Sequence, residues 1–254
     1  MTAPVARDEV ASRTRPGTLA AVLGLTGELL IALGVLLGLF IAWQLWWTDL
    51  VGERAQARIV ADLPWPAPPT LELAGQRAER TGPAPVLEAP ADGTTFATLQ
   101  VPRWGGEPSP ISEGTSKRDV LDRLGIGHYT GTAMPGGIGN FAVAGHRTTY
   151  GKPFNRVEEL QVGDALVVRT EATWYVYRVT STEIVSPRAV DVIDPVPGLP
   201  DATPTIAQMT MTTCHPLFSA RERYVVHAAL DVWLPVDEGT PTALDSATPI
   251  DRGA

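Results

Sequence analysis

The sequence predicts a mostly β domain, an antiparallel barrel or sandwich, preceded by a single N-terminal membrane-spanning helix. Three observations lead to this prediction: an apolar run near the N-terminus, a proline-rich segment after it, and short β-branched and aromatic runs between turn residues over most of the rest. The chain has 254 residues, of which 44% are hydrophobic and 19% are charged. It is therefore long enough for one domain with its own core, and its composition excludes a wholly disordered protein.

The apolar run covers residues 29–47 and reads LLIALGVLLGLFIAWQLWW. As a helix it would span about 28 Å at 1.5 Å per residue, which matches the hydrocarbon core of a bilayer. Arginines precede the run and acidic residues follow it, and this asymmetry places the N-terminus in the cytoplasm. We therefore expect a cytoplasmic tail at 1–17, a single-pass anchor in the plasma membrane at 18–47, and an extracytoplasmic domain after it.

A cleaved signal peptide is the alternative to an anchor. Ala55, Gln56 and Ala57 resemble a cleavage site of the A-x-A kind. The apolar run is longer than the roughly 7 to 15 residues of a signal peptide's hydrophobic region, which favours the anchor. The mass of the mature protein would distinguish the two.

Residues 48–93 are predicted as a helix extension followed by a linker. Seven prolines stand among the 29 residues from 64 to 92. At about 3.1 Å per residue this stretch would reach at most about 90 Å and would hold the domain away from the bilayer. The folded domain is predicted from 94 to 236. The segment 237–254 lacks apolar periodicity and is predicted to be disordered.

Within the domain, turn residues separate short runs that alternate or are apolar throughout. One short helix is predicted at 116–124, with Thr115 or Ser116 as its N-cap and Gly125 after its end. The proline-rich stretch 186–205 is predicted as a long loop, and long loops inside compact domains are often functional. The candidate strands are 96–101, 140–144, 164–169, 173–185, 206–213 and 223–233.

Charge and cysteine content exclude several functions. The 20 basic and 28 acidic residues give a net charge of −8, and the basic residues are scattered, so we expect no nucleic-acid partner. Cys214 is the single cysteine, which excludes an intramolecular disulfide and a cysteine-rich zinc site. We see no carboxylate and histidine cluster with metal-ligand spacing, and we expect no metal and no cofactor. Cys214 is then either a buried apolar side chain or a reactive thiol.

A catalytic thiol needs an accessible thiolate and a group that manages protons, most often histidine. His146 ends the apolar run NFAVAGH and Cys214 ends the run IAQMTMTTC, so both could meet at one rim of a barrel. His215 is a weaker candidate for the base, because adjacent residues of a strand point to opposite faces. Arg221 and Arg223 begin the next strand, and either could donate to an oxyanion. Spacing alone does not choose between these two arginines, since they share a strand face.

These residues resemble the sortases, membrane-anchored cysteine transpeptidases of Gram-positive bacteria. The resemblance covers about residues 94 to 235 and rests on AGHRTT around His146, TMTTCHP around Cys214 and SARERYVVHA around Arg223. The family signature before the cysteine is T-L-x-T-C, and Met211 stands here in place of leucine, a near-isosteric change. The CHP sequence and GHYTGTAMPG at 127–136 are most similar to class E, the housekeeping sortases of actinobacteria.

The resemblance implies an eight-stranded sortase-type β-barrel with one or two short helices. It also implies acyl transfer on secreted proteins that carry a C-terminal LAXTG-like sorting signal. Cys214 would attack the carbonyl between threonine and glycine, His146 would protonate the leaving amine, and Arg223 would bind the motif and the oxyanion. The acceptor would be an amine of the peptidoglycan precursor lipid II. Tyr129 would shape the pocket for the motif's alanine, and Thr213 would help to bind substrate.

Several alternatives remain at this stage. An L,D-transpeptidase would carry its cysteine in an S-H-G-C context, which is absent here. A papain-like hydrolase would place its cysteine before its histidine, whereas His146 precedes Cys214. A peptidase that only hydrolyses the signal would use the same residues. A non-catalytic, membrane-tethered barrel that binds sorting signals would leave Cys214 inert towards thiol-reactive probes.

Overall fold

The computed structural model describes residues 18–69 and 78–245. The chain divides into two compact units, one ending at Trp46 and the other beginning at Trp47. Helix α1 (Thr18–Ala61) is long and apolar enough to cross a membrane. Its large apolar side chains from Leu29 to Ile41 are more than half exposed, and a helix that is apolar on all sides is typical of a membrane span. The predicted cytoplasmic tail, residues 1–17, lies outside the described residues.

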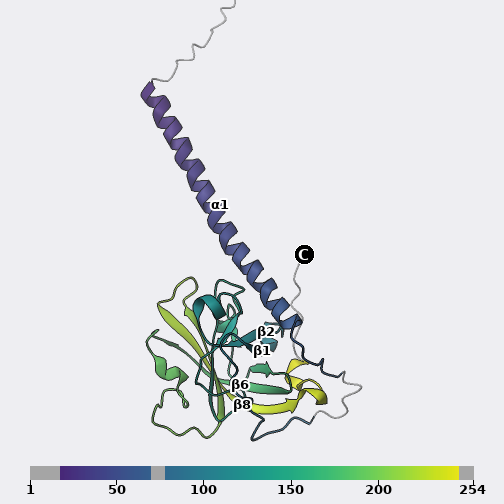
Figure 1. The fold of residues 1–254 in the computed structure, drawn as a ribbon. Helices are drawn as coiled ribbons and strands as arrows, with labels where there is room; N and C mark the ends of the chain where they lie inside the picture. Colours follow the sequence, from purple (N-terminus) through teal and green to yellow (C-terminus); the bar gives the residue numbers. More distant parts are fainter. Residues whose placement is uncertain (1–17, 70–77, 246–254) are drawn as a thin grey trace, which may run out of the picture. The chain divides into compact units, whose positions relative to one another are not determined.

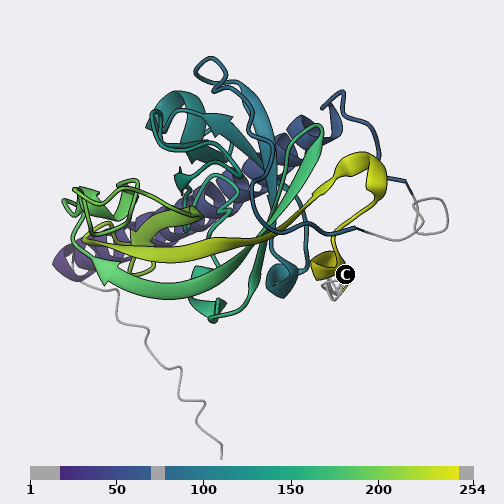
Figure 2. The same cartoon turned by 90° about the horizontal axis from the view of Figure 1, so that it is seen from below.

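The second unit contains a closed eight-stranded barrel with the strand order β1-β2-β3-β4-β7-β8-β6-β5 (Figures 1 and 2). The long strands β6 and β8 run side by side along most of their length. The strands are β1 (Thr95–Gln100), β2 (Ser109–Glu113), β3 (Ile126–His128), β4 (Gly139–Ala144), β5 (Ala165–Arg169), β6 (Thr173–Val185), β7 (Ala207–His215) and β8 (Glu222–Pro235). The short helical elements are η1 (Pro102–Trp104), η2 (Lys117–Leu121), η3 (Val157–Glu159), η4 (Val190–Ile193), η5 (Val236–Glu238) and η6 (Thr242–Leu244).

The barrel confirms the predicted mostly β fold but differs from a purely antiparallel one. The pairs β2–β3 and β4–β7 are parallel, and the other six pairs are antiparallel. Strands β2 and β3 were not among the candidate strands. They have five and three residues, and β2 includes Pro110, so neither shows enough alternation to be recognised from the sequence.

The predicted helix at 116–124 is present in a shorter form. Element η2 is a single π-helical turn, and the side chain of Ser116 accepts a hydrogen bond from the Asp119 backbone N–H. Val120 is its buried residue. Asp122 follows the turn directly as its C-cap.

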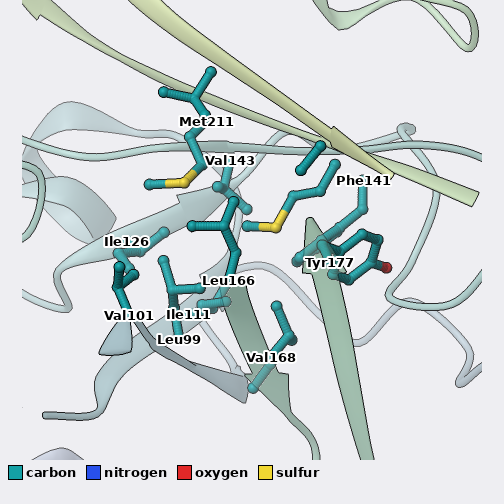
Figure 3. Close-up of a cluster of buried hydrophobic side chains, with 14 of the residues drawn as sticks. Leu99, Val101, Ile111, Ile126, Phe141, Val143, Leu166, Val168, Tyr177 and Met211 are labelled. Carbon is teal, nitrogen blue, oxygen red and sulfur yellow. The ribbon is translucent and has the colours of Figure 1, made fainter. Parts of the chain in front are cut away.

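The barrel interior is filled by apolar side chains from every strand (Figure 3). Strand β5 shows the pattern: Leu166 and Val168 point inward, whereas Ala165 and Val167 belong to a second cluster on the outer face. This alternation follows from the two-residue period of a strand. Both faces of β5 and of the first half of β6 are apolar, so side chains from another segment must also shield the outer face from water.

The C-terminal segment supplies some of these side chains, which contradicts the prediction of disorder for 237–254. After β8 the chain forms η5 and η6, and Val236 and Ala243 are buried against Val167 and Trp174. The segment has too few apolar residues to show periodicity, but Ala243 is buried in the outer cluster and Leu244 packs against it. Residues 246–254 lie outside the described residues.

The linker prediction also needs correction. Arg80 pairs with Trp233 of β8 in an isolated antiparallel bridge, and the Tyr175 hydroxyl donates to the Pro85 carbonyl over 2.7 Å. Ala84 and Leu87 pack against the barrel core. Residues 78–92 therefore lie on the barrel and do not extend as a free spacer, because their apolar side chains gain burial there.

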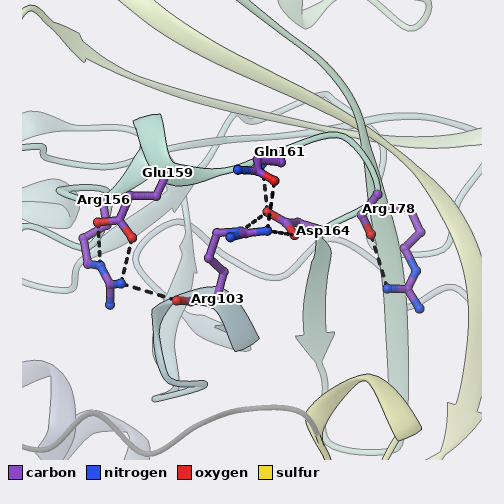
Figure 4. A network of polar contacts seen from close by, with 7 residues as sticks. Arg103, Arg156, Glu159, Gln161, Asp164 and Arg178 are labelled. Carbon is purple, nitrogen blue, oxygen red and sulfur yellow. Dashed lines mark hydrogen bonds and ion pairs between the residues drawn. The ribbon is translucent and has the colours of Figure 1, made fainter.

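A network of ion pairs lies near the start of strand β5 (Figure 4). The Arg103 guanidinium binds the Asp164 carboxylate through two nitrogens, one of them 2.7 Å from Oδ1. Burial opposes ionisation of Asp164, but the hydrogen bonds from Arg103 and from the Gln161 backbone, with the charges of Arg103 and Arg178, hold its pKa below the usual value of 3.8. Asp164 therefore contributes stability as a carboxylate.

Candidate active site

The single cysteine lies on β7 near the end of its ladder with β8. Cys214 is directly opposite Arg223 and His215 is opposite Glu222. Residues directly opposite each other in an antiparallel pair point to the same face with their Cβ atoms about 5 Å apart. Cys214 is partly exposed. The register favours Arg223 over Arg221, because Arg221 lies before the first residue of β8. The Arg223 guanidinium donates to the carbonyls of Ala220 and Glu222, each over 3.0 Å.

His146 reaches the same place from the neighbouring strand. Strands β4 and β7 are parallel and pair Ala144 with Thr212, and the Gly145 backbone N–H still donates to the Thr212 carbonyl over 3.2 Å. The ladder ends at the Ala144–Thr212 pair, and extending its register by two residues along each chain aligns His146 with Cys214. Paired residues of parallel strands share a face, and adjacent strands are about 4.8 Å apart. The parallel pairing thus explains how two residues 68 positions apart converge.

Thr213 locks these two strand ends together. It is buried, and its hydroxyl donates to the Gly145 carbonyl over 2.7 Å. Its parity in β7 is that of Met209 and Met211, which fill the barrel interior. The family resemblance predicts that Thr213 binds substrate. In the structure its hydroxyl proton is instead donated to Gly145, the residue before His146. Its position suits a role in setting the spacing between the two reactive strand ends.

Asp122 is a site residue that the sequence did not reveal. Its Oδ1 lies 2.7 Å from Nε2 of His146, and both side chains are 16% exposed. The same carboxylate binds Lys117, with Nζ 2.8 Å from Oδ2. Asp122 stands in the predicted helix at 116–124, where a surface aspartate carries no signal, and only the fold brings it to the histidine.

Arg147 is the second residue that sequence reasoning missed. Its side chain is 1% exposed, and Nη2 lies 2.7 Å from the Glu158 carboxylate. Its Nη1 donates to Nδ1 of His215 over 2.9 Å and to the Cys214 carbonyl over 3.3 Å. Arg147 thus ties the residue after His146 to the backbone of Cys214. Strand β7 runs through both Cys214 and His215, so His215 points to the opposite face from the thiol, as predicted.

Tyr129, directly after β3, contacts the strand that carries the thiol. Its hydroxyl lies 2.9 Å from Oγ1 of Thr212, two residues before Cys214. Residues two apart in a strand share a face. Tyr129 is partly exposed, so it borders the Cys214 face of the barrel wall.

The other two histidines have structural partners. His128 is fully buried, and its Nδ1 lies 2.6 Å from Oε2 of the buried Glu113. His227 lies between Thr210 and Glu183, 2.9 Å from each. Neither is paired with Cys214 in the register.

The long loop at 186–205 is anchored to β4. The Asn140 side-chain amide donates to the carbonyls of Val192 and Asp194, over 3.2 and 3.0 Å. The loop contains η4 and, together with β6, Gln208 and His227, borders a cavity of about 480 Å³. It is therefore a folded part of the wall near the β7 side of the barrel.

Comparisons with known proteins identify the family of this chain. A sortase domain model matches residues 99–231. Sortase SrtE1 of Streptomyces coelicolor is 36% identical over 253 residues, covering 96% of this chain and 68% of that protein. Sortase SrtE2 of the same organism is 35% identical and covers 86% of each chain.

Solved structures give the same result. The SrtA sortase from Actinomyces oris has a TM-score of 0.62 and 45% identity, covering 65% of this chain and 96% of that one. Sortase E1 from Streptomyces coelicolor, solved with a tripeptide in its active site, has a TM-score of 0.56 and 39% identity, covering 60% and 97%. With the sequence motifs, the barrel and these similarities in agreement, this chain belongs to the sortase family and, within it, to class E.

Proposed function

We propose that this protein is a membrane-anchored cysteine transpeptidase that cleaves a C-terminal LAXTG-like sorting signal and transfers the acyl group to a cell-wall precursor amine. Sortases as a family are cell-wall transpeptidases. The observation that carries the proposal for this chain is the parallel β4–β7 ladder, whose last pair, Ala144 and Thr212, lies two residues before His146 on one strand and two residues before Cys214 on the other. A thiol with an imidazole within reach is the minimal unit of nucleophilic catalysis, and two neighbouring strand ends can supply both groups.

In the first step the Cys214 thiolate attacks the threonine carbonyl of the signal. A bond forms between Sγ and the carbonyl carbon, the threonine–glycine C–N bond breaks, and His146 as imidazolium gives its proton to the leaving glycine amine. Asp122 accepts a hydrogen bond from Nε2–H of His146, so Nδ1 is the nitrogen that exchanges the proton. A thioacyl enzyme remains.

In the second step an amine of lipid II replaces the thiol. Neutral His146 removes a proton from the incoming amine, the new amide bond forms, and the thiolate leaves as the C–S bond breaks. Arg223, opposite Cys214 in the ladder, would turn from the carbonyls of its own turn to donate to the oxyanion. These steps need no metal and no cofactor.

Tyr129 is our candidate for recognising the alanine of the signal. Its hydroxyl is held against Thr212, two residues from Cys214, so its ring is fixed near the thiol. The similarity to class E sortases, which prefer alanine at this position, supports an LAXTG-like motif. The substrates would be secreted proteins that carry such a signal at their C-terminus.

The proposed location is the plasma membrane, with the N-terminus in the cytoplasm and the barrel outside. The apolar helix supports anchoring, and the arginines before it with the acids after it support this orientation. Lipid II is itself membrane-bound, so an anchored enzyme would meet both substrates at the same surface.

The test uses the full chain in detergent micelles with an LAXTG peptide, with and without triglycine as an amine, and mass spectrometry of the products. We expect a threonine–triglycine ligation product that is absent with Cys214→Ala. Cleavage without ligation would indicate a hydrolase. Failure of every sorting peptide to react would overturn the proposal and favour a binding module.

A further inference from the structure

We propose that the last turns of α1 position the catalytic histidine, with Gln56 as the positioning residue, so that the helix end at 47–61 is part of the active site. This inference rests on the proposed role of His146. It concerns residues from Trp47 on, which belong to the same compact unit as the barrel.

The last turns of α1 contact the turn at 150–152, which follows His146. The Gln56 side-chain amide donates to the Tyr150 carbonyl over 2.8 Å, and Gln56 is 7% exposed although it lies on a helix whose other face is in solvent. One and two turns earlier, Gly52 and Asp49 meet the same turn. The Asp49 carboxylate lies 2.8 Å from Nζ of Lys152.

Gly52 shows how close this approach is. A Cβ built on Gly52 would lie 2.5 Å from the backbone nitrogen of Gly151 and 2.5 Å from the carbonyl carbon of Tyr150. Those atoms are backbone, so no side-chain rotation could make room. The helix and the turn are therefore in direct backbone contact, which only glycine at position 52 permits.

The turn that the helix grips is strained. Tyr150, Gly151 and Lys152 have φ angles of 54°, 77° and 36°, three successive residues in the left-handed region. Tyrosine and lysine rarely adopt it, because their Cβ atoms crowd the backbone. Such conformations persist only where the surroundings hold them, and they gather at functional sites. The hydrogen bond from Gln56 to Tyr150 and the ion pair between Asp49 and Lys152 stabilise this left-handed conformation from outside the barrel.

The strained turn in turn fixes the histidine. The ring centroid of Tyr150 lies 5.1 Å from that of His146, with the planes 33° apart. Lys117 lies 5.3 Å above the Tyr150 ring and also binds Asp122, which binds Nε2 of His146. The imidazole is thus held on one side by a carboxylate and on the other by a ring whose backbone is tied to α1.

The consequence is that the position of the helix end at 47–61 and the catalytic rate are coupled. If the helix end is removed or displaced, Tyr150 is released from its left-handed conformation and the stack on His146 is lost. Misplacing a proton-transfer group by about 1 Å costs up to about 100-fold in rate. Loss of these contacts should therefore slow turnover while the nucleophile Cys214 stays in place.

The test measures kcat, KM and the pH profile of ligation for the full chain in detergent micelles. Gln56→Ala and Gly52→Ala should each lower kcat about 5- to 20-fold, leave KM for the LAXTG peptide nearly unchanged, and displace the limb of the profile that His146 controls. Arg54→Ala, exposed on the same turn of the helix, and Gly38→Ala, whose Cβ would meet nothing within 4 Å, are the matched controls and should behave as wild type.

A double mutant separates positioning from general destabilisation. Tyr150→Ala should cause a similar loss, and Gln56→Ala combined with Tyr150→Ala should cause no further loss, because Gln56 acts through Tyr150. Wild-type kinetics in both Gln56→Ala and Gly52→Ala, an equal loss in Arg54→Ala, or additive losses in the double mutant would overturn the inference.

The failure of the proposed function gives a different result. If the wild-type chain shows no Cys214-dependent ligation, the proposed reaction is wrong, but the coupling is still measurable by NMR. The imidazole resonances of His146, assigned with His146→Gln, should move in Gln56→Ala and stay in place in Arg54→Ala. Unmoved resonances in Gln56→Ala would contradict the positioning role by themselves.

Discussion

Nε2 of His146 and Oδ1 of Asp122 are 2.7 Å apart in a partly buried position. The two residues come from different elements: Asp122 follows η2, and His146 lies two residues beyond the end of β4. A carboxylate in this position selects the imidazole tautomer with its proton on Nε2 and fixes the ring plane. In the proposed reaction, Asp122 would therefore leave Nδ1 of His146 for proton exchange with substrate.

Replacing Asp122 should slow catalysis without preventing binding of the sorting peptide. We expect Asp122→Ala to lower kcat about tenfold or more, with a small change in KM, since orientation of a general acid–base group contributes at least this much. Steady-state ligation kinetics measure both constants. Asp119→Ala, on the same turn, is the matched control, and an equal loss in that variant would show that the effect is one of local folding.

The two arginines near the thiol should behave differently. Arg223→Ala should lower kcat/KM by about 100-fold, the usual effect of removing an oxyanion donor, because Arg223 lies opposite Cys214 in the ladder. Arg221→Ala, two residues away and outside β8, should retain near-normal turnover. The reverse ranking in a ligation assay would show that the strand end rearranges when substrate binds.

The buried Arg147 predicts an unequal effect of removing either member of its ion pair. Glu158→Ala leaves a guanidinium that is 1% exposed facing neutral acceptors, at a cost of about 3 kcal/mol. Arg147→Met leaves Glu158, which is 47% exposed and can be hydrated, so its cost should be smaller. Denaturant unfolding of the two variants measures the difference in the free energy of unfolding, and an equal or greater loss for Arg147→Met would contradict this account.

Asp164 should contribute to the loss of stability in acid. Its folded-state pKa lies below the usual value of 3.8, so its stabilising contribution is fully present above about pH 4 and is lost as pH falls through the folded pKa. Asp164→Asn should be less stable than wild type near neutral pH, and its Tm should fall less steeply below about pH 4. Thermal unfolding from neutral to acidic pH tests this. Parallel Tm curves for the two proteins would exclude a role for the Arg103–Asp164 pair.

Much of the fold could be predicted from the sequence because its signals are local. An apolar run of membrane length, β-branched runs between turns, and a cysteine and a histidine each ending such a run can all be recognised without knowing any contact. The strands that were missed, β2 and β3, are the ones too short for their alternation to be visible. The prediction of disorder for the C-terminal segment was also wrong. Ala243 is buried only because it packs in the cluster on the outer face of β5, and the sequence does not show this contact.

By itself the sequence determined the apolar helix of membrane length, the β character of the domain and the identity of Cys214, His146 and Arg223 as candidates for its chemistry. Only the tertiary structure decided which arginine lies opposite the thiol and which residues hold the imidazole. No sequence pattern identifies the three remaining site residues. Asp122 is an aspartate after a helical turn, Arg147 is an arginine after a histidine, and Gln56 is a glutamine on a long helix. Their roles come from pairing between distant segments, and such contacts leave no periodic pattern in the chain.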